Sequence, residues 1–497
     1  MILTLIGAIV VALGLVLLVT GTRLQMLCFV LACSLLNGSA TLIVTALGSV
    51  SIQPALLATV FLALRCLLPG QAREPVLAAS LADNGWLLLL VGYSAVGAWI
   101  LPRLFHDTID VVPLRPVNNP LGLIAFPLRF SAQNITTSAY MALTFLGALC
   151  AHMAVRRAGA AERIARLASL VALAHAGLGW SAAAARGTPA EAVFTFFRNG
   201  HYMQLDQSFE GVARLTGISP EPSLYASFAL AWFIFTTELW LRNVDRRWSG
   251  AAALVLILTL LSSTSTTAYV GLAAYSAVLL VRQLFLVGTI PAAKGLVITA
   301  SLLTLAAAGF AIVAGSEQVA HSVARVLRLT TSEKLNSGSG VARLLWARQG
   351  VDAFVHSWGL GVGAGSFRSS SILTAILGSS GVIGLASLLL YLRRVFRPFG
   401  GVTWRRTGIV ELDVSSAAAW TVVMVLVPAS VSAPSPDPGL VWGLLAGTAL
   451  GLRRLSAGHY LPAPTASVPV ELGGEDRARL SYRRGAPGFR HALGVAS

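Results

Sequence analysis

The chain has 497 residues, of which 56% are apolar and only 11% charged, and its formal net charge is +16. Soluble globular proteins carry about 25% charged residues, so this composition excludes a soluble enzyme and equally a disordered or fibrous chain. It favours a polytopic membrane protein. Nucleic acid is not an expected partner, because basic residues at the cytoplasmic ends of membrane spans account for the charge.

Apolar runs long enough to cross a bilayer, about 20 residues each, recur along the chain. They predict an all-α, polytopic bundle of about thirteen transmembrane helices over residues 1–455. The runs lie at 1–20, 24–46, 50–68, 85–102, 133–154, 167–184, 222–240, 249–263, 266–281, 294–315, 371–391, 413–430 and 438–453. The polar sequence SSTSTT at 262–267 either separates two short helices or breaks a single one.

Dense clusters of arginine mark one set of loops as cytoplasmic, which places the start of the chain on the outer side. Residues 456–497 are rich in Pro, Gly and Arg and are expected to form a disordered, basic cytoplasmic tail. The long loops 103–132, 185–221 and 316–370 then face outward, the last being a large periplasmic loop. These loops hold many basic residues that orientation does not require, so we expect them to bind an anion.

The outer loop 185–221 contains Arg198, His201 and Arg214 and ends in Glu221, followed by Pro222. Proline is favoured in the first helical turn, and an acidic residue there meets the positive end of the helix dipole. Glu221 is therefore either a helix-start residue or a carboxylate at the membrane boundary that acts as a general base toward a hydroxyl.

The outer loop 316–370 ends in a predicted amphipathic helix that carries Arg343 and Arg348. A glycine-rich turn with Gly363 and Gly365 follows it and leads to Arg368. The backbone N–H groups of such a turn can bind a phosphate, or the glycines can allow close approach to another helix. Both interpretations are compatible with the sequence.

Arg129 and Asn134 lie where the span 133–154 begins, and their polar groups either contact sugar hydroxyls or cap the helix. Histidines and acidic residues show no metal-site spacing, so neither a metal nor another cofactor is expected. Glu238 lies near the inner end of its span, where it can pair with Arg242. A proton-coupled transporter is disfavoured, because acidic residues do not recur along the predicted membrane spans as a proton path would require.

Four segments together resemble the bacterial O-antigen and exopolysaccharide polymerase (Wzy-type) and O-antigen ligase family. They read FSAQNITTSAYMALTFLGAL, ARLTGISPEPSLYASFAL, LTLLSSTSTTAYVGLAAY and RLLWARQGVDAFVHSWGLGVGAGSFRSS. The resemblance implies a GT-C-like bundle in the bacterial inner membrane. It also implies a metal-independent glycosyltransferase that moves a glycan from undecaprenyl diphosphate to a sugar hydroxyl at the periplasmic face.

Carried over by motif, Arg214, Arg343 and Arg368 would neutralise the diphosphate, and Glu221 would be the base, with His201 as its alternative. The substrate-binding set comprises Arg348, Arg198, His201, Arg129, Asn134, Gly363 and Gly365. The implied partners are the undecaprenyl-diphosphate-linked oligosaccharide, the growing polysaccharide, membrane lipid, a flippase and chain-length regulators.

Two departures from the family pattern bear on function. Ligases carry a histidine shortly after the glycine-rich segment, and the stretch SFRSSSILTAILGSSG has none, which favours a polymerase. Many relatives have Ser-Arg where this chain has Ser-Thr within 262–267, which removes one expected contact. A ligase and a lipid-linked oligosaccharide flippase or transporter remain the alternatives.

Overall fold

The computed structural model describes residues 1–45, 50–68, 74–114, 124–200, 208–209, 212–286, 288–314, 338–397 and 400–460. The protein is mostly helical, at 73% helix. Within the described residues, seven helices are long and apolar enough to cross a membrane, and further apolar helices are shorter. The architecture is that of a helical membrane protein.

A helix overlaps each of the expected apolar runs. These helices are α1 (Leu5–Thr20), α2 (Arg23–Cys33), α3 (Pro54–Leu67), α5 (Gly85–Leu104), α6 (Ala132–Ala154), α7 (Ala160–Ala184), α9 (Pro222–Leu241), α10 (Arg246–Ser262), α11 (Thr266–Phe285), α12 (Ala292–Ala314), α16 (Ile372–Phe396), α18 (Val410–Met424) with α19 (Leu426–Ala429), and α20 (Leu440–Tyr460). Others are α4 (Glu74–Asp83), α8 (Glu191–Phe197), α15 (Gly338–His356), α17 (Gly401–Trp404) and the 3₁₀ turn η1 (Ser34–Leu36).

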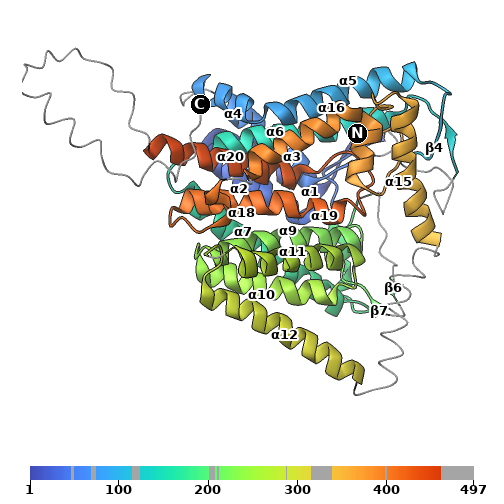
Figure 1. Cartoon of the computed structure of the whole chain (residues 1–497). Helices are drawn as coiled ribbons and strands as arrows, with labels where there is room; N and C mark the ends of the chain where they lie inside the picture. The colour runs from blue at the N-terminus through green and yellow to red at the C-terminus, as the bar shows by residue number, and fades with distance from the viewer. Residues whose placement is uncertain are drawn as a thin grey trace, which may run out of the picture.

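Most of the long helices run side by side, and the two ends of the bundle differ (Figure 1). One end, here called the loop end, carries α15 and the described parts of the segments 103–132 and 185–221. The other end, called the tail end, is where α20 reaches Tyr460. The described segments expected to face outward therefore lie together at the loop end.

Small residues allow the closest helix pair, α6 and α20, to pack backbone to backbone. Gly443, Gly447 and Gly451 recur every four residues on one face of α20. A Cβ atom at Gly447 would lie only 2.0 Å from the carbonyl oxygen of Ala148 on α6. This spacing of small residues is typical of helix pairs in membranes, where close contact replaces the hydrophobic effect between helices.

The expected helical fold class is confirmed, and three small antiparallel sheets accompany the helices. They are β1 (Ile2–Leu3), β2 (Leu42–Val44) and β3 (Val50–Ile52), then β4 (Asp110–Val111) with β5 (Phe126–Pro127), and β6 (Ser208–Phe209) with β7 (Val212–Ala213). The expected span 24–46 is correspondingly too long. Its helix ends at Cys33, and the turn after it brings Gly38 against Ile218, where a Cβ atom would lie 1.9 Å from the carbonyl oxygen.

Two breaks divide the helices. The SSTSTT sequence separates α10 from α11, and Thr264 within it has a positive φ of 50°. Helix α16 is interrupted at Gly381, where φ is 60° and ψ is −154°, a conformation that favours glycine.

The last helix is longer than expected. Helix α20 continues to Tyr460, beyond the expected start of the tail at 456, and 461–497 lie outside the described residues.

A buried ion network at the tail end joins α9 to α11. Glu238 accepts hydrogen bonds from Tyr275 Oη at 2.9 Å, from Arg282 Nη1 at 2.5 Å and from Arg242. All three charged side chains are at most 2% exposed. Arg242 also donates to the carbonyl oxygen of Thr403 at 2.7 Å, which ties α17 to the network. The expected pair of Glu238 and Arg242 is confirmed, and Arg282 joins it.

A second network at the tail end is centred on Asp83. Its carboxylate contacts His152 Nε2 at 3.0 Å and Arg394 Nη2 at 2.5 Å, with Arg454 at 3.4 Å. Burial would raise the pKa of Asp83, but the hydrogen bonds and these positive charges outweigh it and lower the pKa to about 2. The carboxylate therefore joins α4, α6, α16 and α20 as a permanent anion.

Candidate functional site

Helix α15 lies at the loop end and links the segments that carry the candidate arginines (Figure 1). Gln349 Oε1 accepts from the Val112 backbone N–H at 2.7 Å, and its Nε2 donates to the carbonyl oxygen of Arg368 at 3.1 Å. Ser370 Oγ donates to the carbonyl oxygen of Arg343 at 2.5 Å. The predicted helix is thus present as α15, but it is not amphipathic, because Leu344 and Val355 are 64% and 65% exposed. Its hydrogen bonds hold the segment with Arg368 beside the helical turn that carries Arg343.

Arg368 is held by its backbone and by an aromatic ring. Its N–H donates to the carbonyl oxygen of Val112 at 2.9 Å, and Nη1 lies 3.4 Å from the carbonyl oxygen of Leu114. The guanidinium carbon lies 4.4 Å from the centre of the Trp346 ring, a cation–π arrangement. Its Nε is buried and has no hydrogen-bond partner in the described part of the chain. The side chain is therefore oriented but retains hydrogen-bonding capacity.

Arg214 interacts electrostatically with residues from three other positions in the chain. Burial lowers the pKa of its guanidinium, the carboxylate of Glu221 and the hydroxyl group of Tyr269 counteract that effect, and the positive charge of Arg343 adds to it. Glu221, Tyr269 and Arg343, which lie at or near the starts of α9, α11 and α15, are therefore close enough to Arg214 to act on it. We call Arg214, Glu221, Tyr269 and Arg343 the loop-end cluster.

Glu221 is the residue immediately before α9, with Pro222 in the first helical turn. It has the extended backbone of a helix-capping position, yet its side chain makes no capping hydrogen bond with the described first turn of α9. Its Oε1 instead accepts a hydrogen bond from Ser223 Oγ at 2.5 Å. The carboxylate is thus oriented by a hydroxyl and does not satisfy the helix N–H groups.

The glycine-rich turn serves close packing. Val362 and Gly363 donate their backbone N–H groups to the carbonyl oxygens of Gly378 and Ser379 on α16, at 2.8 and 3.0 Å. A Cβ atom at Gly365 would lie 2.3 Å from the carbonyl oxygen of Gln133. Of the two interpretations, the structure favours close approach to helices over phosphate binding for Gly363 and Gly365, because both are buried against neighbouring backbone.

Asn134 and Arg198 likewise have structural contacts. Asn134 Oδ1 accepts from the N–H of Ser131 at 2.8 Å in a capping box, and its Nδ2 donates to the carbonyl oxygen of Ala364 at 2.8 Å. Arg198 Nε donates to the carbonyl oxygen of Gly217 at 2.8 Å. For Asn134 capping is therefore the interpretation that the structure favours over a sugar contact, and Arg198 shapes the loop that presents Arg214.

Of the remaining predicted residues, Arg129 and Arg348 form exposed local ion pairs. Arg129 and Arg348 have side chains that are 66% and 76% exposed. Each is near its own carboxylate, Asp107 at 3.3 Å and Asp352 at 3.8 Å. His201 lies outside the described residues. Among the described residues, no ion pair or hydrogen bond joins Arg129 or Arg348 to Arg214.

Sequence reasoning missed Tyr269 and Asp437. Tyr269 lies one turn after the SSTSTT break, the segment where an arginine contact was in doubt, and its hydroxyl donates to the carbonyl oxygen of Leu261 at 2.9 Å. Asp437 accepts from Thr144 Oγ1 at 2.9 Å, and burial raises its pKa. The sequence signal that could have identified Tyr269 and Asp437 is the position of each polar residue next to a helix end.

The loop-end cluster has the composition of an anion-binding site with a base. Guanidinium groups are permanently charged, planar donors that match phosphate oxygens, and a neighbouring carboxylate can accept a proton from a hydroxyl. Among the described residues, no group of three or more His, Cys, Asp and Glu side chains is arranged to hold a metal ion. The chain matches no protein-family model, and no curated protein or solved structure is significantly similar to it.

Proposed function

We propose that the protein is an inner-membrane glycosyltransferase that polymerises undecaprenyl-diphosphate-linked oligosaccharide repeat units at the periplasmic face. The observation that carries the proposal is the loop-end cluster, in which Arg214 and Arg343 interact beside Glu221. A lipid diphosphate that departs from a sugar gathers negative charge, and positioned guanidinium groups stabilise that charge. The thirteen-span, GT-C-like architecture is part of this proposal.

In the proposed reaction, a hydroxyl oxygen of the acceptor sugar attacks the anomeric carbon of the donor glycan. The bond from that carbon to the lipid diphosphate oxygen breaks, and the diphosphate leaves with the bonding electrons. Glu221 accepts the hydroxyl proton, and Arg214, Arg343 and Arg368 contact the diphosphate. The hydrogen bond from Ser223 to Glu221 supports this role, because it orients the carboxylate at the start of α9.

Reconstitution distinguishes the proposed polymerase from its alternatives. Purified protein in liposomes receives undecaprenyl-diphosphate-linked oligosaccharide, and the products are separated by size. A polymerase yields a ladder of longer lipid-linked glycans and releases undecaprenyl diphosphate without any further acceptor. A ligase needs a separate lipid or protein acceptor, and a flippase moves the substrate between leaflets without consuming it.

The sidedness of the site is tested by cysteine labelling. Gly340→Cys on α15 should react with a membrane-impermeant thiol reagent added outside the inner membrane, and Gly400→Cys at the tail end should not. The parent chain, with Cys28, Cys33, Cys66 and Cys150, provides the background. Labelling of Gly400→Cys alone would reverse the orientation and contradict a periplasmic active site.

A further inference from the structure

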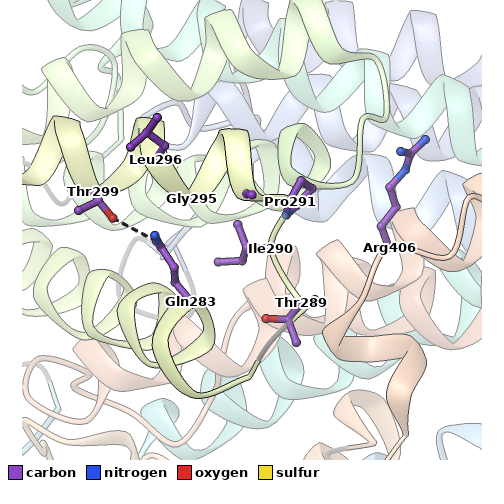
Figure 2. A pocket seen from close by; sticks show the side chains of 10 residues that line it. Gln283, Thr289, Ile290, Pro291, Gly295, Leu296, Thr299 and Arg406 are labelled. Atoms are coloured by element: carbon purple, nitrogen blue, oxygen red, sulfur yellow. Dashed lines mark hydrogen bonds between the residues drawn. The ribbon is translucent and has the colours of Figure 1, made fainter.

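A cavity of about 630 Å³ lies at the tail end, between the end of α11 and the beginning of α12. Gln283, Ile290, Pro291, Leu296, Thr299 and Arg406 are among its lining residues. Figure 2 shows Ile290 in the middle of the lining, with Arg406 beyond Pro291 and the Gln283–Thr299 hydrogen bond on the opposite side. This volume is in the range of small-molecule sites.

The charge around the cavity is positive. Arg406 forms no ion pair or side-chain hydrogen bond with any described residue, and both it and Arg246 act electrostatically on Lys294 at the start of α12. Lys294 itself is committed to the bundle, because its ammonium donates to the carbonyl oxygen of Trp240 and to Asn243. Arg406, which lines the cavity, is therefore available to a ligand, and Arg246 and Lys294 strengthen the positive potential there.

The walls beyond the cavity are apolar and exposed. Helix α12 lies obliquely at the edge of the bundle (Figure 1), and its Leu296 and Leu303 are 70% and 65% exposed. On α11, Leu284 and Phe285 are 68% and 75% exposed. A cationic group at a helix end with a continuous apolar surface beside it matches a lipid, whose phosphate lies at the interface and whose acyl chains lie in the hydrocarbon.

We propose that this cavity binds the head group of an anionic phospholipid, with the guanidinium of Arg406 on the lipid phosphate. Gln283 and Thr299 supply polar contacts to the head group, and the exposed face of α12 covers the acyl chains. The apolar surface favours a lipid over free inorganic phosphate, because only a lipid has acyl chains that can contact it. The proposal is independent of the glycan-polymerising function, because the cavity and the loop-end cluster lie at opposite ends of the bundle.

The test measures lipid binding to the purified full-length protein in detergent by native mass spectrometry. Phosphatidylglycerol should bind roughly 10-fold more tightly than phosphatidylcholine. Both lipids carry the phosphate, but the choline cation of phosphatidylcholine is repelled by the positive charge of Arg406, Arg246 and Lys294. Arg406→Ala should abolish this preference. The matched control is Arg405→Ala, which removes an adjacent exposed charge that does not line the cavity and should leave the preference intact.

Two further variants separate charge from shape and from misfolding. Arg406→Lys retains a cation and should bind phosphatidylglycerol within a few-fold of the parent. Gly295→Leu should weaken binding without any change in charge, because a Cβ atom there lies 3.1 Å from the Gln283 amide and fills the cavity. Equal affinity for both lipids in the parent, or equal loss in the 405 and 406 variants, overturns the proposal. Displacement of the lipid by millimolar inorganic phosphate would do so as well.

Discussion

Arginine serves different purposes at the two ends of the bundle. At the tail end, Arg242 and Arg282 share the buried carboxylate of Glu238 and are almost completely enclosed. At the loop end, Arg214 and Arg343 lie close to each other with Glu221 as the carboxylate that acts on Arg214. At the tail end, arginines paired with a buried carboxylate connect helices. At the loop end, arginines outnumber the neighbouring carboxylate, and this excess of positive charge is suited to binding an anion.

Removal of the Glu238 carboxylate should have the largest effect on the molecule. Glu238→Ala leaves two buried guanidinium groups without a counter-ion, which typically costs about 3–5 kcal/mol. We expect the yield of folded protein and its Tm in detergent to fall sharply. The control is Glu162→Ala, an exposed residue of α7. Equal Tm values for the two variants would mean that the buried network does not hold α9 and α11 together.

Loss of either loop-end arginine should abolish activity and spare stability. Arg214→Ala and Arg343→Ala should each lower polymer formation by roughly 100-fold or more, because a charge-stabilising contact in a transition state is worth about 2–4 kcal/mol. The Tm should stay near that of the parent. Lysine at either position should also fail if bidentate contact with the diphosphate is required.

Arg103→Ala is the matched control for the arginine variants. It removes a charge from the same end of the bundle, where the guanidinium lies 3.8 Å from the centre of the Phe130 ring and is not among the groups that act on Arg214. Polymer formation by this variant should remain close to the parent level. Normal polymer length from Arg214→Ala and Arg343→Ala would end the assignment of these residues to the diphosphate.

Glu221→Gln tests the base without altering the local packing. The amide oxygen can still accept the hydrogen bond from Ser223, so the start of α9 should be unchanged. Because general-base catalysis contributes about 100-fold or more, chain growth should drop by at least that factor in the polymerisation assay. A fully active variant would return Glu221 to the role of a helix-start residue.

The exposed arginines should matter least. Arg129→Ala and Arg348→Ala remove solvated ion pairs worth less than about 1 kcal/mol, so activity and Tm should change by less than roughly 2-fold and a few degrees. A loss comparable with that of Arg214→Ala would place them in the substrate path and would make the loop-end site wider than the described contacts indicate.

The positions of most helices follow from the sequence, because an apolar run of suitable length has few other ways to satisfy its backbone in lipid. The prediction of one span over 24–46 was wrong because the chain turns at Gly38 and packs against Ile218. A hydropathy profile does not reveal a packing partner so far along the chain. The helix that carries Arg343 was predicted, but its amphipathic character was not borne out, because Leu344 and Val355 are exposed.

The candidate site was predictable only in part. Arg214, Arg343 and Glu221 were singled out because charge on the outer loops needed a reason. The glycines and Asn134 fitted two interpretations, and only their partners on α16 and in the glycine-rich turn separate these. Tyr269 depends on how α11 packs beside the other elements, which a single sequence does not reveal.

The interruption of α16 at Gly381 has a consequence for the accuracy of the site. Val362 and Gly363 bond to α16 just before the interruption, and Val382 just after it donates to the carbonyl oxygen of Gly359 at 3.0 Å. These hydrogen bonds fix the position of the glycine-rich turn after α15 relative to α16, both before and after Gly381. A side chain at 381 would push the two segments apart, and the resulting tilt would be amplified along α15 into a displacement of Arg343.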